Sequence, residues 1–270
     1  MSAQTIFITG ATDGIGKLTA RDLAKLNKDA AILIHGRNKI KLDKVIEEIK
    51  SASGNQNVEG YIADLSSMDD VRKLANDVLA KHDKINILIN NAGAGFAASR
   101  YGKDGTETRF TVNYLAPFLL THLLLPAIKN AAPSRIINVA SAGQSPVNFK
   151  DIMLEKSFDG LTAYTQSKLA LIMFTIDLAD ELKNDNVTVN SLHPGTYLDT
   201  NMVHDAGIKP HGTAQSGADA TIYLATSPTL KNTTGEYFNV KNEAKANAQA
   251  YDMDARKQLR NLSLKLTNLT

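Results

Sequence analysis

The feature that most constrains the fold is an alternation between short apolar runs and amphipathic stretches, which starts near the N-terminus and continues along most of the chain. The short runs are typical of buried strands, and the stretches between them repeat apolar residues at helical spacing. Strands that alternate with helices build βαβ units, whose strands pair in parallel. The sequence therefore predicts an α/β fold, a Rossmann-type doubly wound parallel sheet of about seven strands with helices on both faces.

The predicted strands are residues 5–9, 31–35, 58–62, 85–90, 135–140, 187–192 and 237–240. The predicted helices are residues 17–26, 40–49, 69–81, 105–130 and 162–182. Neither a repeat nor a linker divides the 270 residues, so we expect a single domain over residues 1–270. Residues 241–270 are expected to form a C-terminal helical tail that covers a pocket, packs on the core or joins a subunit interface.

Composition narrows the range of functions and partners. Thirty basic and 28 acidic residues give a net charge of +2, so no strong field attracts nucleic acid or anionic lipid. The lack of cysteine excludes disulfides and thiolate catalysis, and the six histidines show no metal-binding spacing, so no metal site is predicted. The N-terminus has no signal-peptide pattern, and no stretch reaches about 18 uninterrupted apolar residues. We expect a cytoplasmic protein without a membrane anchor. The sequence does not decide whether the protein forms a homo-oligomer.

A glycine-rich segment, Gly10 to Gly16, lies between the first predicted strand and the first predicted helix. Glycines let the backbone approach a pyrophosphate closely, and the N-terminus of the following helix offers free N–H groups. An ordinary glycine-rich turn is the alternative, since the spacing is GxxxGxG; the place after the first strand favours a dinucleotide site. The predicted contacts are Gly10, Thr12, Asp13, Gly14, Ile15 and Gly16.

The end of the second predicted strand indicates which dinucleotide binds. Sites for NAD usually place a carboxylate there, which accepts hydrogen bonds from the ribose 2′-hydroxyl. This chain instead has Arg37 and Asn38, and the Arg37 guanidinium can donate to a 2′-phosphate. Lys17 could add a second positive charge. A solvated arginine that opens a loop is the alternative, but beside the glycine turn Arg37 favours NADP(H).

Two further strand ends carry residues suited to a nucleotide. Asp64 and Leu65 follow the third predicted strand, where the Asp64 carboxylate can accept a hydrogen bond from an adenine amino group. Asn91, Ala92 and Gly93 follow the fourth, and their small size gives a cofactor access to the backbone. Each pattern alone is typical of an ordinary turn.

Tyr164 and Lys168 are four residues apart in a predicted helix, so their side chains lie on one face. A phenol has a pKa of roughly 10, and a nearby positive charge favours the phenolate. The pair is therefore a candidate general acid or base. Considered alone, a surface helix that carries both residues by chance is the alternative.

Seven motifs occur in the order of a known family, and together they are far more specific than any one of them. They are TGATDGIG at residues 9–16, DL at 64–65, NNAG at 90–93, VN at 112–113, Ser141 after a strand, YTQSK at 164–168 and HPG at 193–195. Over residues 5–240 the chain resembles the single-domain short-chain dehydrogenases/reductases. HGRN at 35–38, SLHPG at 191–195 and GEYF at 235–238 resemble the retinol-dehydrogenase-like, WW-domain-oxidoreductase-like branch.

This resemblance implies a catalytic tetrad of Asn113, Ser141, Tyr164 and Lys168. Tyr164 would protonate a carbonyl oxygen or take a proton from an alcohol. Lys168 would lower the pKa of Tyr164 and hold the nicotinamide ribose, so both residues would also contact the cofactor. Ser141 would donate a hydrogen bond to the substrate oxygen, and Asn113 would connect Lys168 to a proton-relay water.

The same resemblance implies that Pro194, Gly195 and Thr200 contact the cofactor, although an extra residue in the family's PGxxxT motif leaves Thr196 as an alternative to Thr200. The segment 144–159 is longer than usual for the family and is expected to form a wall on the substrate side. Residues expected near the pocket suggest an apolar substrate. They are Phe96, Phe149, Met153, Phe158, Tyr197 and Met202.

The function predicted from the sequence is an NADP-dependent oxidoreductase acting on a carbonyl or alcohol substrate. A redox-sensing module that holds NADP(H) without turnover is the alternative. That alternative predicts a tetrad with at least one residue replaced, whereas all four residues are present here. A sugar-nucleotide epimerase or dehydratase is a third hypothesis. Such enzymes usually have a GxxGxxG motif and a sizeable C-terminal substrate domain, and this sequence has neither.

Overall fold

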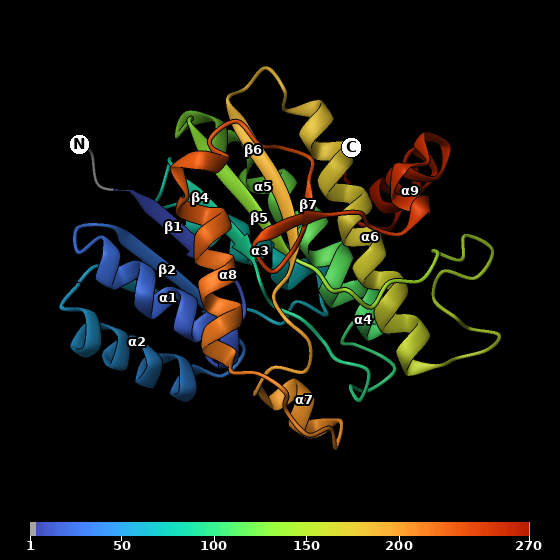
Figure 1. Ribbon diagram of the computed structural model, residues 1–270, viewed down its shortest axis with the longest axis horizontal. Coiled ribbons are helices and arrows are strands. Elements are labelled where there is room, and N and C mark those ends of the chain that lie inside the picture. The colour runs from blue at the N-terminus through green and yellow to red at the C-terminus, as the bar shows by residue number, and fades with distance from the viewer. Residues whose placement is uncertain (1–3, 270) are drawn as a thin grey trace.

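The computed structural model describes residues 4–269, and within them one sheet of eight strands forms the centre of the molecule (Figure 1). The strand order is β3-β2-β1-β4-β5-β6-β7-β8. All neighbours pair in parallel except β7 and β8, which pair antiparallel. The bounds are β1 (Thr5–Ile8), β2 (Ala31–Gly36), β3 (Val58–Ile62), β4 (Ile87–Asn90), β5 (Ser134–Val139), β6 (Val187–His193), β7 (Tyr237–Asn239) and β8 (Asn242–Ala244).

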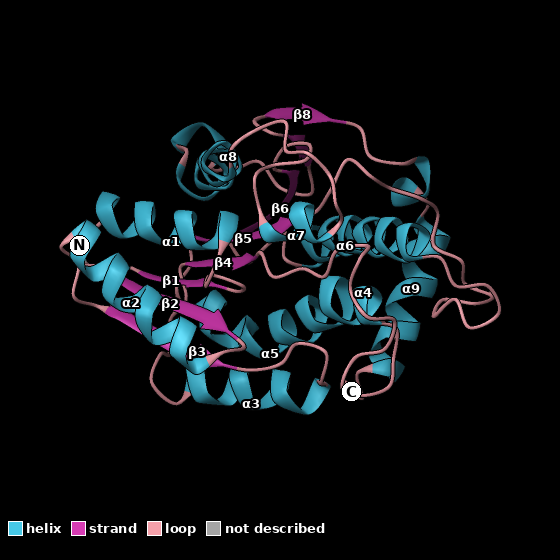
Figure 2. Cartoon of the chain, turned by 90° about the horizontal axis from the view of Figure 1, so that it is seen from below, coloured by secondary structure: helices cyan, strands magenta, loops and turns pink. Residues whose placement is uncertain are grey.

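Helices cover both faces of this sheet (Figure 2). On one face lie α1 (Gly14–Leu26), α2 (Lys39–Ser53) and α8 (Ala214–Thr226). On the other lie α3 (Met68–Leu79), α5 (Ala116–Asn130) and α6 (Gly160–Glu181). The shorter helices are α4 (Thr108–Phe110), α7 (Asn201–Asp205), and the 3₁₀ turns Pro228–Leu230 and Ala248–Tyr251; a π-helical turn spans Thr111–Leu115 and α9 spans Met253–Leu266.

The strands explain the three layers, because successive residues point to opposite faces of the sheet. In β1, Ile6 and Ile8 join the apolar core beneath α1, α2 and α8, whereas Phe7 joins the core beneath α3, α5 and α6. All four residues of β1 are buried. A parallel sheet needs such cover on both faces, so the predicted α/β fold is confirmed.

The structure differs from the sequence prediction in its C-terminal part. An eighth strand, β8, follows the seven predicted ones; its residues Asn-Glu-Ala have no apolar run that could reveal it. The predicted helix 105–130 begins at Thr108 and contains the π-helical turn. Helix α8 was not predicted because its small side chains give it little helical periodicity.

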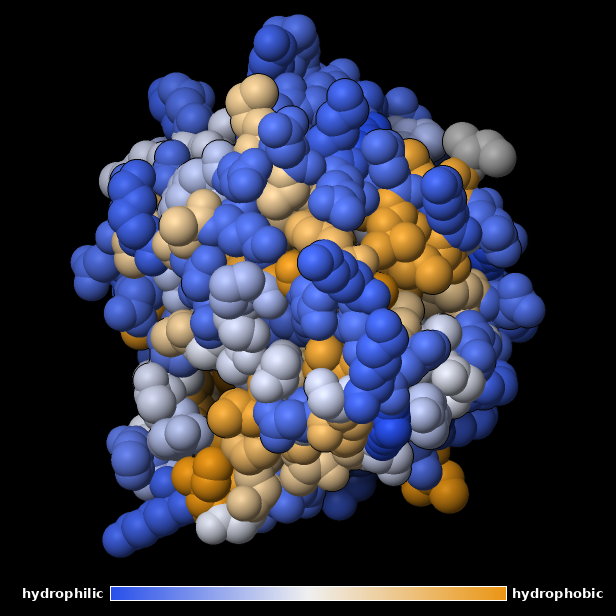
Figure 3. Space-filling view, turned by 90° about the vertical axis from the view of Figure 1, so that its right-hand side faces the viewer, coloured by the Kyte–Doolittle hydropathy of each residue, from blue (hydrophilic) through white to orange (hydrophobic). Residues whose placement is uncertain are grey.

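The C-terminal tail packs on the core. Its helix α9 lies along α6 (Figure 1), where Leu259 is buried and the Arg260 guanidinium donates to Glu181 at 2.7 Å. The Ser263 and Tyr114 hydroxyls form a hydrogen bond of 2.6 Å. The face that α9 and residues 144–159 cover is mainly hydrophilic, with apolar side chains exposed between hydrophilic ones (Figure 3).

One continuous helical stretch, Thr108–Asn130, is long and apolar enough to cross a membrane by length and composition. However, 72% of its most apolar part is buried inside the fold, where α5 packs on β4 and β5 and beside α3. It therefore serves as a core helix in this structure. The cytoplasmic location and the lack of an anchor stay predictions.

Candidate active site

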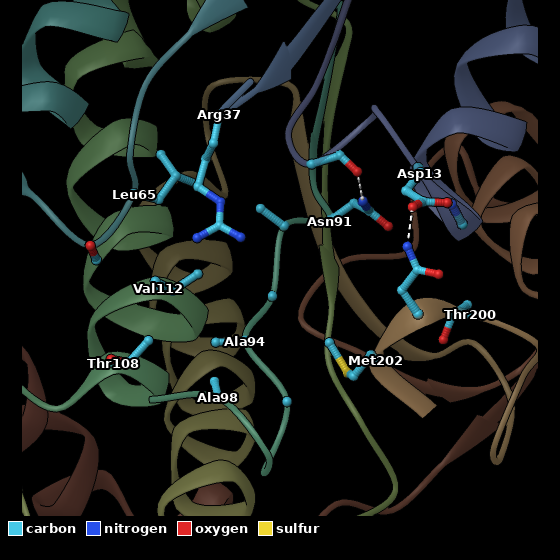
Figure 4. A pocket seen from close by; sticks show the side chains of 18 of the residues that line it. Asp13, Arg37, Leu65, Asn91, Ala94, Ala98, Thr108, Val112, Thr200 and Met202 are labelled. Carbon is cyan, nitrogen blue, oxygen red and sulfur yellow. Dashed lines mark hydrogen bonds between the residues drawn. The ribbon is translucent and has the colours of Figure 1, made fainter. Parts of the chain in front are cut away.

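A cavity of about 840 Å³ lies at the carboxyl ends of the parallel strands. Its lining comes from the segments that follow β1, β2, β3, β4, β5 and β6. The strand order reverses between β1 and β4, and open α/β sheets bind their ligands in the crevice at such a switch point. In Figure 4, Arg37 and Leu65 lie on one side of this cavity, Thr200 and Met202 on the other, and Asn91 between them.

The glycine turn after β1 is held tightly against β4. Gly10 has a left-handed φ of +64°, and a Cβ there would come within 2.6 Å of the Ala92 backbone. A Cβ on Gly16 would come within 2.4 Å of the Gly10 carbonyl oxygen. The Asn91 side chain donates to the carbonyl oxygens of Thr9 (2.9 Å) and Gly10 (3.0 Å). Only glycine fits these two positions of the turn.

His35, a residue that sequence reasoning did not single out, supports the turn from β2. Its Nδ1 accepts a hydrogen bond from the Gly10 N–H (3.1 Å), which leaves Nε2 to donate to the Ala63 carbonyl oxygen (3.1 Å). The ring is 1% exposed, and burial lowers the pKa of His35 to about 4. The imidazole is therefore neutral at physiological pH.

The predicted cofactor end of the cavity contains Arg37, and it also contains Lys41, which sequence reasoning missed. Lys41 Nζ lies 2.6 Å from Asp13 Oδ2. Lys17, expected to be the second cation, pairs instead with Glu48 at 2.5 Å and is not among the described residues that line the cavity. A lysine in the first turn of the following helix was the signal that could have indicated Lys41.

Asn38 is exposed and does not line the cavity in the part of the chain that the structure describes. Its side-chain oxygen accepts a hydrogen bond from the Lys41 N–H at 3.0 Å, so it caps α2. Asp64 and Leu65 do line the cavity, and Asp64 Oδ1 accepts hydrogen bonds from the Ser66 N–H (3.0 Å) and hydroxyl (2.8 Å). Asn91, Ala92 and Gly93 line it as well.

Tyr164 and Lys168 project from α6 into the same cavity. Lys168 Nζ lies 5.7 Å from the centre of the Tyr164 ring and donates to the Val139 carbonyl oxygen at 2.9 Å. Lys168 is 4% exposed, and burial lowers the pKa of Lys168 to about 8. Ser141, at the carboxyl end of β5, accepts a hydrogen bond on Oγ from the Gly143 N–H at 3.0 Å.

The pKa of Tyr164 is shifted upwards, whereas Lys168 is expected from the sequence to lower it. Burial raises the pKa of Tyr164, and a hydrogen bond with the Ser141 hydroxyl offsets only part of that rise. The expected lowering by Lys168 is therefore not found in this arrangement. The phenol keeps its proton at neutral pH, as a general acid must.

Asn113 lies in the π-helical turn and is fully buried. Its side-chain amide donates to the Ala94 carbonyl oxygen (3.1 Å) and the Ser167 hydroxyl (2.9 Å), and its oxygen accepts from the Ala94 N–H (2.7 Å). It thereby ties the loop after β4 to α6. A Cβ on Gly93 would lie 3.4 Å from Asn113 Oδ1 and 3.6 Å from Lys168 Nζ, so the two polar ends flank Gly93.

The segment after β6 brings Pro194 and Thr200 to the cavity. Among the described residues, Gly195 and Thr196 are not part of the lining, and the Thr196 hydroxyl instead contacts His193 Nε2 at 3.1 Å. Thr200 is therefore better placed than Thr196 to reach a ligand.

The wall that segment 144–159 is expected to form does not line this cavity and stays a prediction. No residue of segment 144–159, which the structure describes completely, lines the cavity, and of the six aromatic and methionine residues named above only Met202 does so. The Phe96 ring packs edge-on against Tyr164, with 6.0 Å between the ring centres. The loop after β4 adds small residues to the lining, and of these Gly95 lies against Met202; they are Ala94, Gly95, Ala97, Ala98 and Ser99.

The chain matches the family model for short chain dehydrogenases over residues 4–210. The protein therefore belongs to the short-chain dehydrogenase family of oxidoreductases, which act with a nicotinamide cofactor. Within it the chain is similar to the retinol dehydrogenases: retinol dehydrogenase 13 of Mus musculus is 34% identical, over 98% of this chain and 84% of that protein. The predicted family and branch are confirmed.

Solved structures agree with this assignment. An uncharacterised protein from Mycobacterium paratuberculosis has a TM-score of 0.80 and 28% identity, over 98% of this chain and 93% of that chain. A metagenomic short-chain oxidoreductase in complex with NADP has a TM-score of 0.68 and 29% identity, over 88% of this chain and 97% of that chain.

Proposed function

We propose that the protein is an NADP(H)-dependent oxidoreductase that transfers a hydride between the cofactor and a carbonyl or alcohol group of an apolar substrate. The observation that carries the proposal is a single cavity with Arg37 and Lys41 at one end and Tyr164 and Lys168 at the other. The cofactor, when bound, supplies or accepts the hydride. The protein supplies binding, orientation and the proton.

The cavity and its residues fit NADP(H). A volume of about 840 Å³ lies in the range of roughly 300–1,000 Å³ that is usual for ligand pockets. The glycine turn and the N-terminus of α1 suit a pyrophosphate. The guanidinium of Arg37 and the ammonium of Lys41 suit a 2′-phosphate, and no carboxylate follows β2 directly to favour NAD. The related metagenomic structure, which carries NADP, supports this choice.

The residues around Tyr164 suit the transfer of a proton to a carbonyl oxygen. The raised pKa of Tyr164 keeps the phenol protonated, so it can donate during reduction. The Ser141 Oγ accepts from Gly143, and its hydroxyl forms a hydrogen bond with Tyr164, so the two hydroxyls are placed to bind the same substrate oxygen. Lys168, on the same helix, has an ammonium suited to the ribose hydroxyls. Asn113 holds the loop that faces Lys168.

The substrate side favours an apolar molecule. The loop after β4 contributes three alanines and Gly95 to the lining, Met202 lies against Gly95, and the Phe96 ring packs on Tyr164. The retinol dehydrogenase named above makes retinal and retinol reasonable members of a substrate panel, alongside other aldehydes, ketones and steroids.

The test is cofactor oxidation with NADPH and with NADH across this panel, using the parent protein and Tyr164→Phe. We expect turnover with NADPH, and we expect Tyr164→Phe to reduce it by about 10²–10⁴-fold, the contribution of general acid–base catalysis. NADPH binding should persist, because the phenyl ring keeps nearly the same volume. Full activity of Tyr164→Phe would contradict the mechanism, and NADPH binding without turnover of any substrate would favour a redox-sensing module.

A further inference from the structure

We propose that the C-terminal segment, residues 242–266, positions Ser141 in the active site through the side chain of Gln144. Gln144 is then a positioning residue, and the tail is part of the catalytic apparatus although it does not touch the cavity. This inference rests on the proposed function, because it assumes that Ser141 binds the substrate oxygen.

The backbone of Ser141 is anchored by two side-chain donors. Gln144 Nε2 donates to the Ser141 carbonyl oxygen at 2.9 Å, and the Tyr237 hydroxyl donates to the same oxygen at 3.2 Å. The Ser141 residue is 8% exposed. Ser141 lies just beyond the end of β5, where the sheet no longer fixes the chain. These two donors therefore fix the direction from which its hydroxyl approaches a substrate.

The Gln144 side chain connects the Ser141 carbonyl oxygen to the C-terminal segment. Its side-chain oxygen accepts a hydrogen bond from the Asn247 N–H at 2.7 Å, so both ends of the amide are used. A second pair of contacts follows three residues later, where Gln249 accepts from the Val147 N–H (2.6 Å) and donates to the Val147 carbonyl oxygen (3.3 Å). The tail thus holds the segment after Ser141 at two points.

The tail is itself firmly attached to the fold. Strand β8 pairs with β7, the strand that carries Tyr237, and Ala250 is fully buried. Helix α9 is fixed by the Tyr114–Ser263 hydrogen bond and by the pairing of Arg260 with Glu181. Because α9 packs on α6, which carries Tyr164 and Lys168, the tail sets Ser141 relative to the residues with which it must act.

The first test replaces the amide with a side chain of similar length that cannot form hydrogen bonds. A misplacement of about 1 Å can cost on the order of 100-fold in rate, so we expect Gln144→Met, which leaves Tyr237 in place, to lose about tenfold in kcat. The KM for the substrate and the Kd for NADPH should stay within about twofold, because Gln144 contacts neither ligand.

Gln144→Glu separates positioning from a general structural effect. The carboxylate still accepts from Asn247 but cannot donate to the Ser141 carbonyl oxygen, so kcat should fall as in Gln144→Met at neutral pH. When the carboxyl group is protonated at lower pH, it regains a donor, and the ratio of variant to parent kcat should rise. A ratio that does not change with pH would overturn the proposed role of the Gln144 amide.

Gln249→Met is the matched control, because it removes the contacts with Val147 and leaves those of Ser141 intact. We expect its melting temperature to fall at least as far as that of Gln144→Met, whereas its kcat should stay within about twofold of the parent. An equal loss of kcat in both variants would overturn the specific role of Gln144.

Ser141→Ala separates the inference from the proposed function. If Ser141→Ala loses turnover while both Gln144 variants keep it, the positioning role is wrong and the proposed function stands. If Ser141→Ala keeps the turnover of the parent, Ser141 does not bind the reacting oxygen, and the inference fails together with that part of the mechanism.

Discussion

The two ends of the cavity are built in different ways. The cofactor end consists of the short turns that directly follow β1 and β2 and of the first residues after β4, and its contacts join neighbouring strands, as Asn91 does with Thr9 and Gly10. The substrate end consists of long loops, and each is held in place by a few side chains that donate hydrogen bonds to its backbone. A short turn has little freedom between its strand and the following helix, whereas the course of a long loop depends on those few side chains.

Arg109 illustrates the substrate end. Its guanidinium is buried, pairs with Glu107 at 2.8 Å, and donates to the carbonyl oxygens of Phe96 (3.0 Å) and Ser99 (3.2 Å). The loop it holds places the Phe96 ring against Tyr164. A buried charge that loses its partner is strongly destabilising, so one side chain controls the shape of the whole loop.

Lys168 lies where the two ends meet, and its replacement should have the largest effect. Lys168→Met should weaken NADPH binding and lower turnover by about 10²-fold, because the ribose loses the ammonium proposed to hold the cofactor in position for hydride transfer. Steady-state kinetics and fluorescence titration with NADPH would measure the two losses. Loss of turnover with unchanged NADPH affinity would place Lys168 in the substrate end alone.

The same variant should not lose stability at neutral pH. The pKa of Lys168 is lowered by burial to about 8, below the value of 10.5 for an exposed lysine. Between these values the folded state binds fewer protons than the unfolded state, so the stability of the parent should rise as pH increases from about 8 to 10.5. Denaturation across this range should show the rise in the parent and a weaker one in Lys168→Met.

The cofactor end of the cavity could be predicted from the sequence better than the substrate end. The seven parallel strands and the cavity contacts Gly10, Arg37, Asp64 and Asn91 were predicted because strand ends and turn residues are local signals. The sequence could not show that the carbonyl of Ser141 accepts a hydrogen bond from Tyr237, 96 positions away, or that its second donor, Gln144, is itself held by Asn247. It also could not show that burial raises the pKa of Tyr164, because burial arises from the whole fold.

Arg37→Asp tests whether the cofactor end can change alone. A hydrogen bond to a charged group contributes about 1.5–3 kcal/mol, so NADPH should bind at least about 10- to 100-fold more weakly, while NADH should bind equally or better. If the cofactor end and the substrate end of the cavity act independently, the kcat of Arg37→Asp at saturating NADH should remain near the kcat of the parent with NADH. A large loss of that kcat would show that Arg37 also affects the substrate end.

The buried His35 should make the cofactor end sensitive to acid. The pKa of His35 is lowered by burial to about 4, from 6.5. The contribution of the neutral ring is fully present above pH 6.5 and is lost as pH falls towards 4, at up to about 1.4 kcal/mol per pH unit. Chemical denaturation at several pH values would measure this slope.

His35→Gln should be less stable at neutral pH but should lack most of the slope between pH 6.5 and 4. His204→Gln is the control, because His204 is exposed, lies outside the glycine turn and pairs with Asp199. Equal slopes for the parent and His35→Gln would contradict the assignment of this acid sensitivity to His35.

The smallest expected effect concerns Lys41, whose ammonium is about half-exposed and held by Asp13 at 2.6 Å. Exposed ion pairs contribute up to about 1 kcal/mol, so Lys41→Gln should weaken NADPH binding by up to about fivefold and leave NADH binding unchanged. Asp13→Asn should strengthen NADPH binding, because it frees Lys41 and removes a negative charge, while asparagine can still cap α1. Lys39→Gln is the control, since Lys39 pairs with Asp43 and, among the described residues, is not part of the cavity lining. If Lys39→Gln and Lys41→Gln weaken NADPH binding equally, the effect is one of general charge, and Arg37 alone would hold the 2′-phosphate.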